Sequence, residues 1–262
     1  MPWVTRGLRN GVLTSRYPAR ADGYRENWHG GVVVKPAPAG TSVADLAEIC
    51  PTAAIGATRE GAPVVDRGKC ILCGRCVAER PDVFEFDPSF ELASLARPAL
   101  VVPATDESAA SLAVLRTKLS RRVGALRRSV HLRHVDAGSD GSEEWEVAAL
   151  LNPVYDIHRL GIFFTASPRH ADILFATGAG SAGMSGPLRL SYDAMPDPRV
   201  VVAVGTDAIS GGIVSPSYAT AGGVGETVPI DVWVPGSPPS PFSMLHGILM
   251  AIGRLPRQGA SW

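Results

Sequence analysis

The sequence has no excess of charge, since 25 lysines and arginines balance 25 aspartates and glutamates over 262 residues. That balance argues against a general nucleic-acid-binding protein. The sequence also lacks any apolar run near the roughly 18 residues that a membrane-spanning helix needs. The first six residues, Met1 to Arg6, have no long apolar core of the kind found in signal peptides. We therefore expect a cytoplasmic protein with reduced thiols. Partner subunits could still hold such a protein at the cytoplasmic face of a membrane.

Cysteine is scarce, and its four positions are the most informative feature of the chain. Cys70, Cys73 and Cys76 form a C-x2-C-x2-C run, and Cys50 stands apart in a Cys-Pro pair. Three thiolates on one short loop and a fourth from a separate Cys-Pro hold a [4Fe–4S] cluster in bacterial ferredoxins. Zinc is the alternative, although it usually takes two separated pairs of ligands, and disulfides are a weaker one.

A second set of cluster cysteines is missing. A two-cluster ferredoxin repeats C-x2-C-x2-C-x3-C-P, and each cluster takes its fourth ligand from the other run. Here Gly40, Val43 and Leu46 occupy the positions of the first run, and Arg80 stands where the second Cys-Pro would begin. All four missing positions belong to one cluster, so we expect a single cluster. The pattern resembles the ferredoxin subunits of complex I and energy-converting hydrogenases with one cluster deleted.

The order of predicted elements divides the chain into four parts. We expect an extended N-terminal segment over residues 1–35 and a ferredoxin-like 4Fe–4S domain over 36–94. A linker and basic amphipathic helix follow over 95–135, and an α/β domain over 136–262. In the ferredoxin-like part the patterns predict strands at 31–35, 62–66 and 83–86, and helices at 43–49 and 76–79.

The second half alternates strands with helices. Near-continuous apolar runs predict buried strands at 160–165, 172–178, 199–205 and 230–234, and helices are expected at 187–192 and 242–254. This order is typical of a doubly wound, flavodoxin-like parallel sheet. The fold class we expect is therefore α/β plus α+β.

A basic helix is predicted between the two domains, from Glu107 to about Ser129. The stretch from residue 108 to 135 has seven basic residues and no acidic one: Arg116, Lys118, Arg121, Arg122, Arg127, Arg128 and Arg133. Such a stretch is either a docking stripe for an acidic partner or anionic headgroups, or a solvated helix face.

Four spaced motifs in the second half carry a family resemblance. They are Leu151–Ile162, Ala166–Leu174, Tyr192–Pro198 and Val234–Pro241. Together they resemble the 20 kDa subunit of NADH:quinone oxidoreductase and the small subunit of membrane-bound, group 4 [NiFe] hydrogenases. The chain thus resembles a ferredoxin subunit fused to such a small subunit.

The resemblance implies a further cluster beside a large subunit, held by four cysteines. The matching positions in this chain are Asp140, Glu143, Asp207 and Ser237. Thiolates hold such clusters, so we expect this second cluster to be absent. Three acids and a hydroxyl at one place would suit Mg²⁺ or Ca²⁺. Pairing with Arg or Lys, or loops open to water, are the alternatives.

Other candidates weigh less. The glycine-rich loop 178–183 resembles a phosphate-binding loop, although the family uses this place for packing. We expect hydrogen-bonding or surface roles for His131, His134, His158 and His170. No Ser-His-Asp arrangement has sequence support, and we expect no catalytic residue in this chain.

Two functions remain open from the sequence. The first is an electron-transfer or connecting subunit of a membrane-associated, oxidoreductase-like complex with one [4Fe–4S] cluster. The resemblance implies a hydrogenase- or complex I-like large subunit, membrane-embedded pump-like subunits and a ferredoxin or other electron donor as partners. The second is a scaffold whose cluster is structural or sensory. A carboxylate–metal hydrolase is a weaker third, because no general base can be named.

Overall fold

The computed structural model describes residues 2–20, 28–38, 40–103, 109–124, 126 and 129–255. In chain order, the first half contains α1 (Pro2–Asn10), β1 (Gly31–Val34), α2 (Val43–Ile49), β2 (Ile55–Ala57), β3 (Pro63–Asp66), α3 (Arg75–Glu79), β4 (Phe84–Asp87) and β5 (Val101–Val102). The second half contains α4 (Ala109–Arg122), β6 (Val130–Asp136), α5 (Ser142–Ala149), β7 (Ile162–Phe164), β8 (Ile173–Thr177), α6 (Ala182–Asp193), β9 (Val200–Val204), α7 (Gly205–Ser210), β10 (Val232–Val234) and α8 (Pro241–Ala251).

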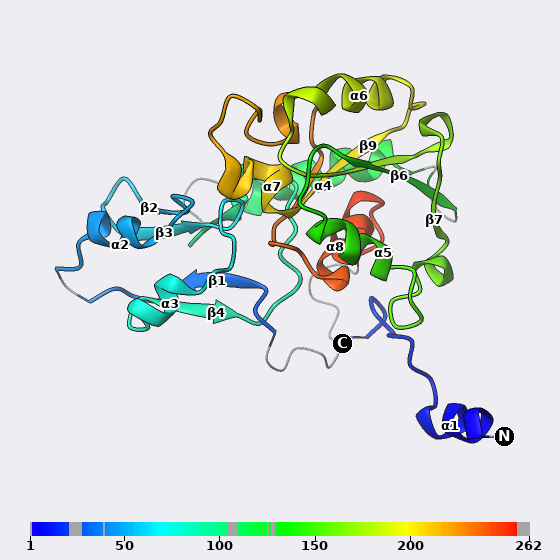
Figure 1. Ribbon diagram of the computed structural model, residues 1–262, viewed down its shortest axis with the longest axis horizontal. Helices are drawn as coiled ribbons and strands as arrows, with labels where there is room; N and C mark the ends of the chain where they lie inside the picture. The colour runs from blue at the N-terminus through cyan, green and yellow to red at the C-terminus, as the bar shows by residue number, and fades with distance from the viewer. Residues whose placement is uncertain are drawn as a thin grey trace.

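Two small antiparallel sheets form the ferredoxin-like part, on the left of Figure 1. Strand β1 pairs with β4, and β3 pairs with both β2 and β5. The strands and helices predicted here are confirmed. Strands β2 and β5 are additions, and β5 lies within the stretch that was expected to be linker. Leu46 and Phe84 are fully buried between the sheets and the two short helices. The four cysteines lie at the edge of this small core.

A five-stranded parallel sheet forms the second part, in the order β10-β9-β8-β6-β7. The predicted doubly wound α/β fold is confirmed. Strand β6, which lies next to the central strand β8, was not among the predicted strands, and it pairs with β7 on one side and β8 on the other.

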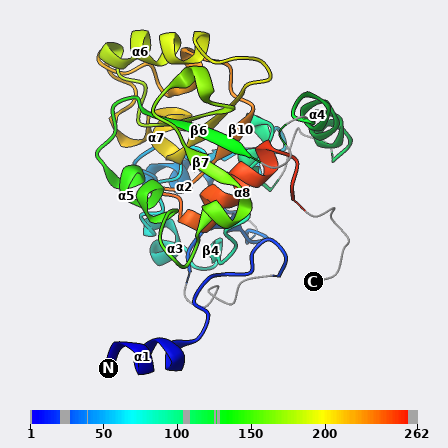
Figure 2. The ribbon, with the colours of Figure 1, turned by 90° about the vertical axis from the view of Figure 1, so that its right-hand side faces the viewer.

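Both faces of this sheet are covered, as the predicted apolar runs require (Figure 2). Alternate strand residues such as Phe175 and Val202 pack against α4, α5 and α8. The residues between them, such as Leu174 and Val201, pack against α6 and α7. Since a strand exposes successive side chains on opposite faces, the two cores share the same strands.

Two predictions for the first half and the linker need correction. Residues 1–35 were expected to be extended, but Pro2–Asn10 form helix α1, because apolar residues recur there at helical spacing. The basic helix is shorter than predicted and ends at Arg122, which pairs with Asp231. The other described basic residues of α4 are exposed. Glu107, Arg127 and Arg128 lie outside the described residues.

Aromatic side chains from three segments hold the two parts together. Tyr17, from the N-terminal segment, and Phe90, from the end of the ferredoxin-like part, lie 5.2 Å apart. Phe242 of α8 stacks on Phe90 at 5.1 Å. Ser94 and Trp233 add a pair of backbone hydrogen bonds between the parts. Within the described residues, no helix is both long enough and apolar enough to cross a bilayer.

Candidate metal centre

The four cysteines surround one pocket at the edge of the ferredoxin-like core. Cys50 follows helix α2, Cys70 and Cys73 lie on the loop after β3, and Cys76 lies in the first turn of α3. All four line the same cavity, together with apolar side chains that include Val32, Ile49 and Val65. Cys73 is exposed and the other three are partly buried. The predicted ligands are thus brought together from two separate segments.

The backbone of both cysteine segments is shaped so that amides face the sulfurs. Ala53 and Leu72, which are not glycines, have φ of 49° and 54°, and Gly74 has φ of 75°. The Ala54 amide donates a hydrogen bond to Cys50 Sγ at 3.2 Å. Left-handed conformations are costly for residues with a Cβ, and they cluster at functional sites. Here they turn the chain around the pocket.

The pocket alone stabilises thiolates poorly. The pKa of Cys70 is raised to about 12, mainly by burial and to a smaller extent by Cys76, Cys50 and Cys73, against a hydrogen bond from the Leu72 amide. Burial also raises the pKa of Cys76. Metal ligation needs deprotonated thiols, and a bound cation supplies the charge that makes this favourable. Four thiols around an apolar pocket therefore fit an iron–sulfur cluster, whose chemistry is reversible one-electron transfer.

The alternatives of a disulfide and a single zinc ion receive no support. All four cysteines are free. Among the described residues, no three His, Cys, Asp or Glu side chains lie close enough to hold a single ion. The thiols instead enclose a space, as ligands on different corners of a multi-iron cluster do.

The second predicted site lies at the carboxyl edge of the parallel sheet. Asp140 and Glu143 follow β6, Asp207 follows β9, and Ser237 follows β10. In open α/β sheets, binding sites form outside this edge, where the strand order reverses. The loops here therefore occupy the position of a functional site even though they contain no cysteine.

Three acids converge at this edge, and Glu143 is the most enclosed of them at 1% exposure. The pKa of Glu143 is raised to about 7, mainly by burial and to a smaller extent by Asp207 and Asp140. Burial also raises the pKa of Asp207, with contributions from Asp140 and Glu144. The Ser142 hydroxyl and amide hold the pKa of Asp140 low. Glu143 lies against Gly205, where a Cβ would approach Glu143 Oε1 to 2.5 Å.

The described residues support neither a bound Mg²⁺ or Ca²⁺ ion nor Arg or Lys pairing at this acidic site. In the part of the chain that the structure describes, no Lys or Arg forms an ion pair with Asp140, Glu143 or Asp207. No three described acidic side chains there are close enough to bind one cation. Ser237 lines a different cavity, of about 690 Å³, beside Leu72, Tyr155 and Phe242. The raised pKa of Glu143 favours its neutral form, which limits repulsion between the acids.

One residue that sequence reasoning missed links the two sites. Thr206 is fully buried, and its hydroxyl lies 3.0 Å from the Cys70 carbonyl oxygen and 3.1 Å from that of Gly236. Its amide also donates to the Gly236 carbonyl at 2.7 Å. The cysteine loop is therefore held directly against the carboxyl edge of the sheet. The acidic site and the cluster pocket are neighbours.

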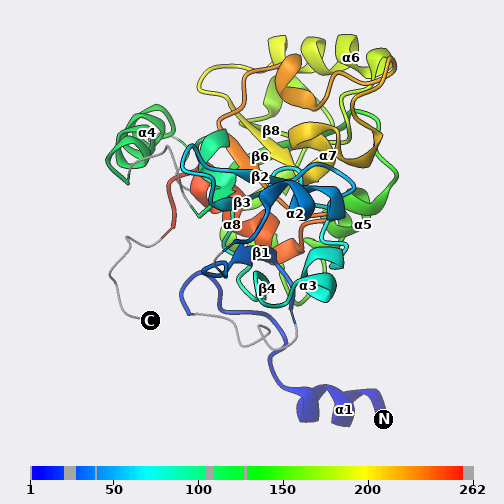
Figure 3. The same ribbon diagram turned by 90° about the vertical axis from the view of Figure 1, so that its left-hand side faces the viewer.

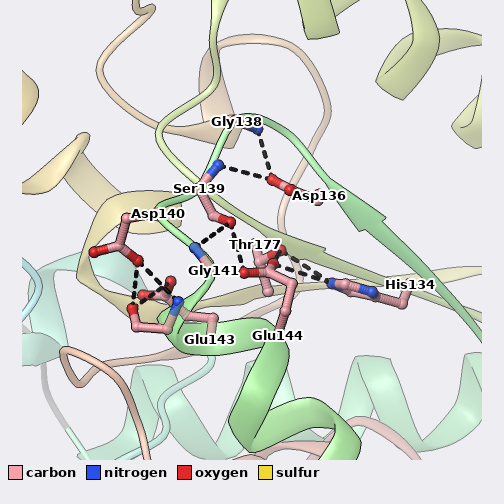
Figure 4. Close-up of polar contacts among 10 residues, drawn as sticks. His134, Asp136, Gly138, Ser139, Asp140, Gly141, Glu143, Glu144 and Thr177 are labelled. Atoms are coloured by element: carbon pink, nitrogen blue, oxygen red, sulfur yellow. Dashed lines mark hydrogen bonds and ion pairs between the residues drawn. The ribbon is translucent and has the colours of Figure 1, made fainter.

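A second missed feature is the polar network around Glu144 (Figure 4). Its carboxylate accepts hydrogen bonds from Ser139 and Thr177, both at 2.5 Å. His134 lies 3.0 Å from the Thr177 hydroxyl, and burial lowers its pKa. Asp136 accepts from the amides of Gly138 and Ser139. The Asp136 carboxylate thus already accepts the hydrogen bonds that the Gly138 and Ser139 amides could otherwise donate to a bound anion.

The glycine-rich loop after β8 serves packing. A Cβ at Gly178 would lie 2.7 Å from the backbone of Gly138 and Ser139, and one at Gly180 would lie 2.6 Å from the Gly223 carbonyl oxygen. Both glycines have positive φ. The close approach of neighbouring loops explains these glycines without a phosphate.

Comparison with known proteins agrees with this arrangement. The family model for the NADH ubiquinone oxidoreductase 20 Kd subunit matches residues 141–251, and that for a 4Fe–4S single cluster domain matches residues 64–115. The second match includes Cys70, Cys73 and Cys76 but not Cys50. The α/β part thus defines the class of protein, and the cysteine part adds an iron–sulfur domain.

Individual proteins of similar sequence narrow the family further than the family models do. The chain is 40% identical over 155 residues to formate hydrogenlyase subunit 7 of Escherichia coli, covering 59% of this chain and 58% of that protein. It is 37% identical to the probable membrane-bound hydrogenase subunit mbhJ of Pyrococcus furiosus, over 53% of this chain and 86% of that one. The chain therefore belongs to the family that contains this hydrogenase subunit and the NADH ubiquinone oxidoreductase 20 Kd subunit.

Two further proteins are also similar to this chain. An uncharacterized protein of Methanocaldococcus jannaschii is 38% identical over 47% of this chain and 82% of its own length. Among solved structures, a chain of the membrane-bound sulfane sulfur reductase (MBS), an archaeal respiratory membrane complex, matches at 28% identity and a TM-score of 0.44. That match covers 52% of this chain and 76% of that chain. At that TM-score the assignment rests on the sequence relatives.

Proposed function

We propose that this chain is an electron-transfer or connecting subunit of a membrane-associated complex related to complex I and energy-converting hydrogenases. Its one redox centre is a [4Fe–4S] cluster held by Cys50, Cys70, Cys73 and Cys76. The observation that carries the proposal is the pocket that these four thiols line. The family relation, with its named formate hydrogenlyase and hydrogenase members, supports the kind of complex.

The partners follow from the same relation. The chain docks a hydrogenase- or complex I-like large subunit and, with it, membrane-embedded pump-like subunits. A ferredoxin or another small carrier delivers the electron. Cys73 is the exposed ligand, so the cluster meets the surface on its side. Burial and the amide hydrogen bonds set the environment of the cluster within the chain.

A scaffold is the second candidate, and the acidic site favours it. The positions that hold cysteines in the family carry Asp140, Glu143, Asp207 and Ser237 here. An electron on the remaining cluster then has no second cluster to reach within this chain. In this reading the cluster is structural or sensory, and the α/β part holds the partners together.

The test is iron and sulfide analysis of anaerobically purified protein, with electron paramagnetic resonance after reduction. We expect about four irons per chain and one S = 1/2 type signal, as one [4Fe–4S] cluster requires. About eight irons and two interacting signals would show a second cluster held without cysteines. Bound zinc without iron would overturn the redox proposal and leave the scaffold.

A matched pair of variants tests which residues bind the proposed cluster. Cys73→Ser removes one thiolate ligand, so we expect the bound iron to fall to a small fraction of that in the parent protein. Asp207→Ala alters the acidic site and should leave the iron content unchanged. Loss of iron from the Asp207 variant would contradict the placement. Circular dichroism of both variants checks that the fold is retained.

A further inference from the structure

Helix α1 stands away from the rest of the molecule. None of its residues, Pro2–Asn10, is buried, and Trp3 and Leu8 are 73% and 80% exposed. Figures 1 and 3 show the helix at one end, beyond the segment that joins it to the body. A nine-residue helix is marginally stable in water without packing. It therefore needs a surface to lie on.

The side chains of α1 are divided between two faces. At about 100° per residue, Trp3, Val4 and Leu8 fall on one side of the helix. Arg6 and Arg9 fall on the other. The apolar character continues after the helix, where Val12 and Leu13 are 84% and 54% exposed. The helix is amphipathic, with its apolar face uncovered by any described residue.

Charge narrows the choice of surface. The first 20 residues contain four arginines, Arg6, Arg9, Arg16 and Arg20, and no acidic residue. The whole chain is neutral, whereas this segment has four positive charges and no negative side chain. A one-sided basic segment is attracted to an anionic surface. Helices that lie in the headgroup region of a bilayer typically have tryptophan and leucine on one face and arginine on the other.

The segment that follows fixes this helix to the body. The Ser15 amide donates to the Val154 carbonyl, and the Thr14 hydroxyl donates to that of Pro153. Tyr17 is 1% exposed, and Arg159 donates to its carbonyl oxygen. The connection between helix and body is therefore short and well packed. Binding of α1 to a surface would orient the whole chain on that surface.

We propose that α1 is a membrane-surface anchor that lies in the headgroup region of a bilayer rich in anionic lipid. Trp3, Val4 and Leu8 enter the apolar boundary, and Arg6 and Arg9 contact the headgroup phosphates. The anchor goes beyond the proposed function and requires neither the cluster nor the large subunit. It also holds the chain at a membrane by its own residues, which differs from attachment through partners alone.

The experiment is flotation of the full, iron-loaded chain with vesicles. One set contains equal parts of phosphatidylglycerol and phosphatidylcholine, and the other contains phosphatidylcholine alone. We expect the chain to float with the anionic vesicles, to float less with the neutral ones, and to be released by high salt. Failure to float with anionic vesicles at low salt would overturn the proposal.

Variants assign the binding to α1. Trp3→Ser with Leu8→Ser should lower binding at least about tenfold, because each side chain contributes apolar burial. Arg6→Gln with Arg9→Gln should lower binding to anionic vesicles toward the neutral level. The control is Leu190→Ser. Leu190 is 71% exposed, and its helix α6 lies at the end of the molecule opposite α1 (Figure 2). This variant should float as the parent does.

The remaining outcomes also decide the question. Unchanged flotation of the Trp3/Leu8 variant would overturn the proposal. The proposal would also be overturned if the parent fails to float and the Trp3/Leu8 variant loses binding to its partner subunits. In that case α1 would bind a protein. Iron content is measured on each variant and should not change. A failure of the anchor is thereby distinguished from a failure of the cluster assignment.

Discussion

At the scale of single residues, Glu143 shows how burial acts on a carboxyl group at the edge of the sheet. A buried carboxyl among like charges holds its proton more tightly than a free one. The pKa of Glu143 is about 7 in the folded chain, against an ordinary value of 4.5. Between these values the folded state binds more protons than the unfolded state. Its contribution to stability is therefore most favourable at low pH and declines as the pH rises toward 7.

Glu143→Gln should remove this decline, because the amide stays neutral at every pH. At pH 8 we expect the variant to be more stable than the parent by about 1–3 kcal/mol, since one pKa unit corresponds to about 1.4 kcal/mol. At pH 4 the two should be nearly equal. Chemical denaturation at both pH values measures this. Glu60→Gln, at an exposed position, is the control. Equal pH dependence of parent and variant would contradict the prediction.

Single residues also show the limit of inference from the sequence. The spacing of the four cysteines predicted a shared site, and the structure gathers them around one pocket. Of the four acidic-site positions, three interact and Ser237 lines another cavity. The role of Thr206 could not be predicted, since its hydroxyl binds a carbonyl oxygen, a group that every residue carries.

At the scale of elements, local signals explain which predictions succeeded. Helix α2 has the predicted bounds because Ser42 caps it, accepting from the Asp45 amide, and because Cys50-Pro51 ends it. Strand β6 was missed because His131 and Arg133 interrupt its apolar residues and extend the basic run before it. Helix α1 was missed because Pro2 and Gly7 lower helix propensity in a short segment.

The turn between β3 and the cysteine loop depends on one ion pair. Arg97 donates to both carboxylate oxygens of Asp66 at 2.7 and 2.8 Å, and the pair is largely buried. Asp66 also accepts from the Gly68 amide, and its carbonyl accepts from the Cys70 amide. The pair therefore fixes the direction in which the chain enters the metal pocket.

Arg97→Lys should loosen this turn, because an ammonium group cannot reproduce the two parallel hydrogen bonds of the guanidinium. We expect a loss of about 1–2 kcal/mol of stability and faster loss of iron to a chelator. Arg80→Lys is the matched control, since Arg80 makes the same two-bond contact to Asp82 at the surface. It should have a smaller effect. Equal effects of both changes would contradict the role given to Asp66.

At the scale of the whole molecule, the two parts form a continuous body. Aromatic packing of Tyr17, Phe90 and Phe242 joins them on one side. The hydroxyl of Thr206 joins them at the cysteine loop. The parallel sheet could be predicted from its apolar runs, because they reflect burial on both faces. The contacts between the parts could not, because they join residues distant in sequence and carry no periodic signal.

Thr206→Val should weaken this junction while keeping the volume of the side chain. The Cys70 carbonyl loses its donor, so we expect a loss of about 1–2 kcal/mol. Amide hydrogen exchange should accelerate at residues 70–76 and remain unchanged in β9. Thr206→Ser restores the hydroxyl and should recover most of the loss. The control is Thr117→Val on the exposed face of α4. Unchanged exchange in the Thr206→Val protein would show that the contact is incidental.

The four cysteines come from two separate segments of the chain, and this bears on how fast the protein is degraded in the cell. The proposed cluster, joined to Cys50 and to Cys70–Cys76, would be an inorganic cross-link that closes the chain between them. Such a link restricts the unfolded chain and makes metal binding part of the folding free energy. Without iron, new chains would lack this link, and we expect proteases to cleave their first half more readily. The amount of this subunit would then follow the iron supply through turnover of the protein, without any change in its synthesis.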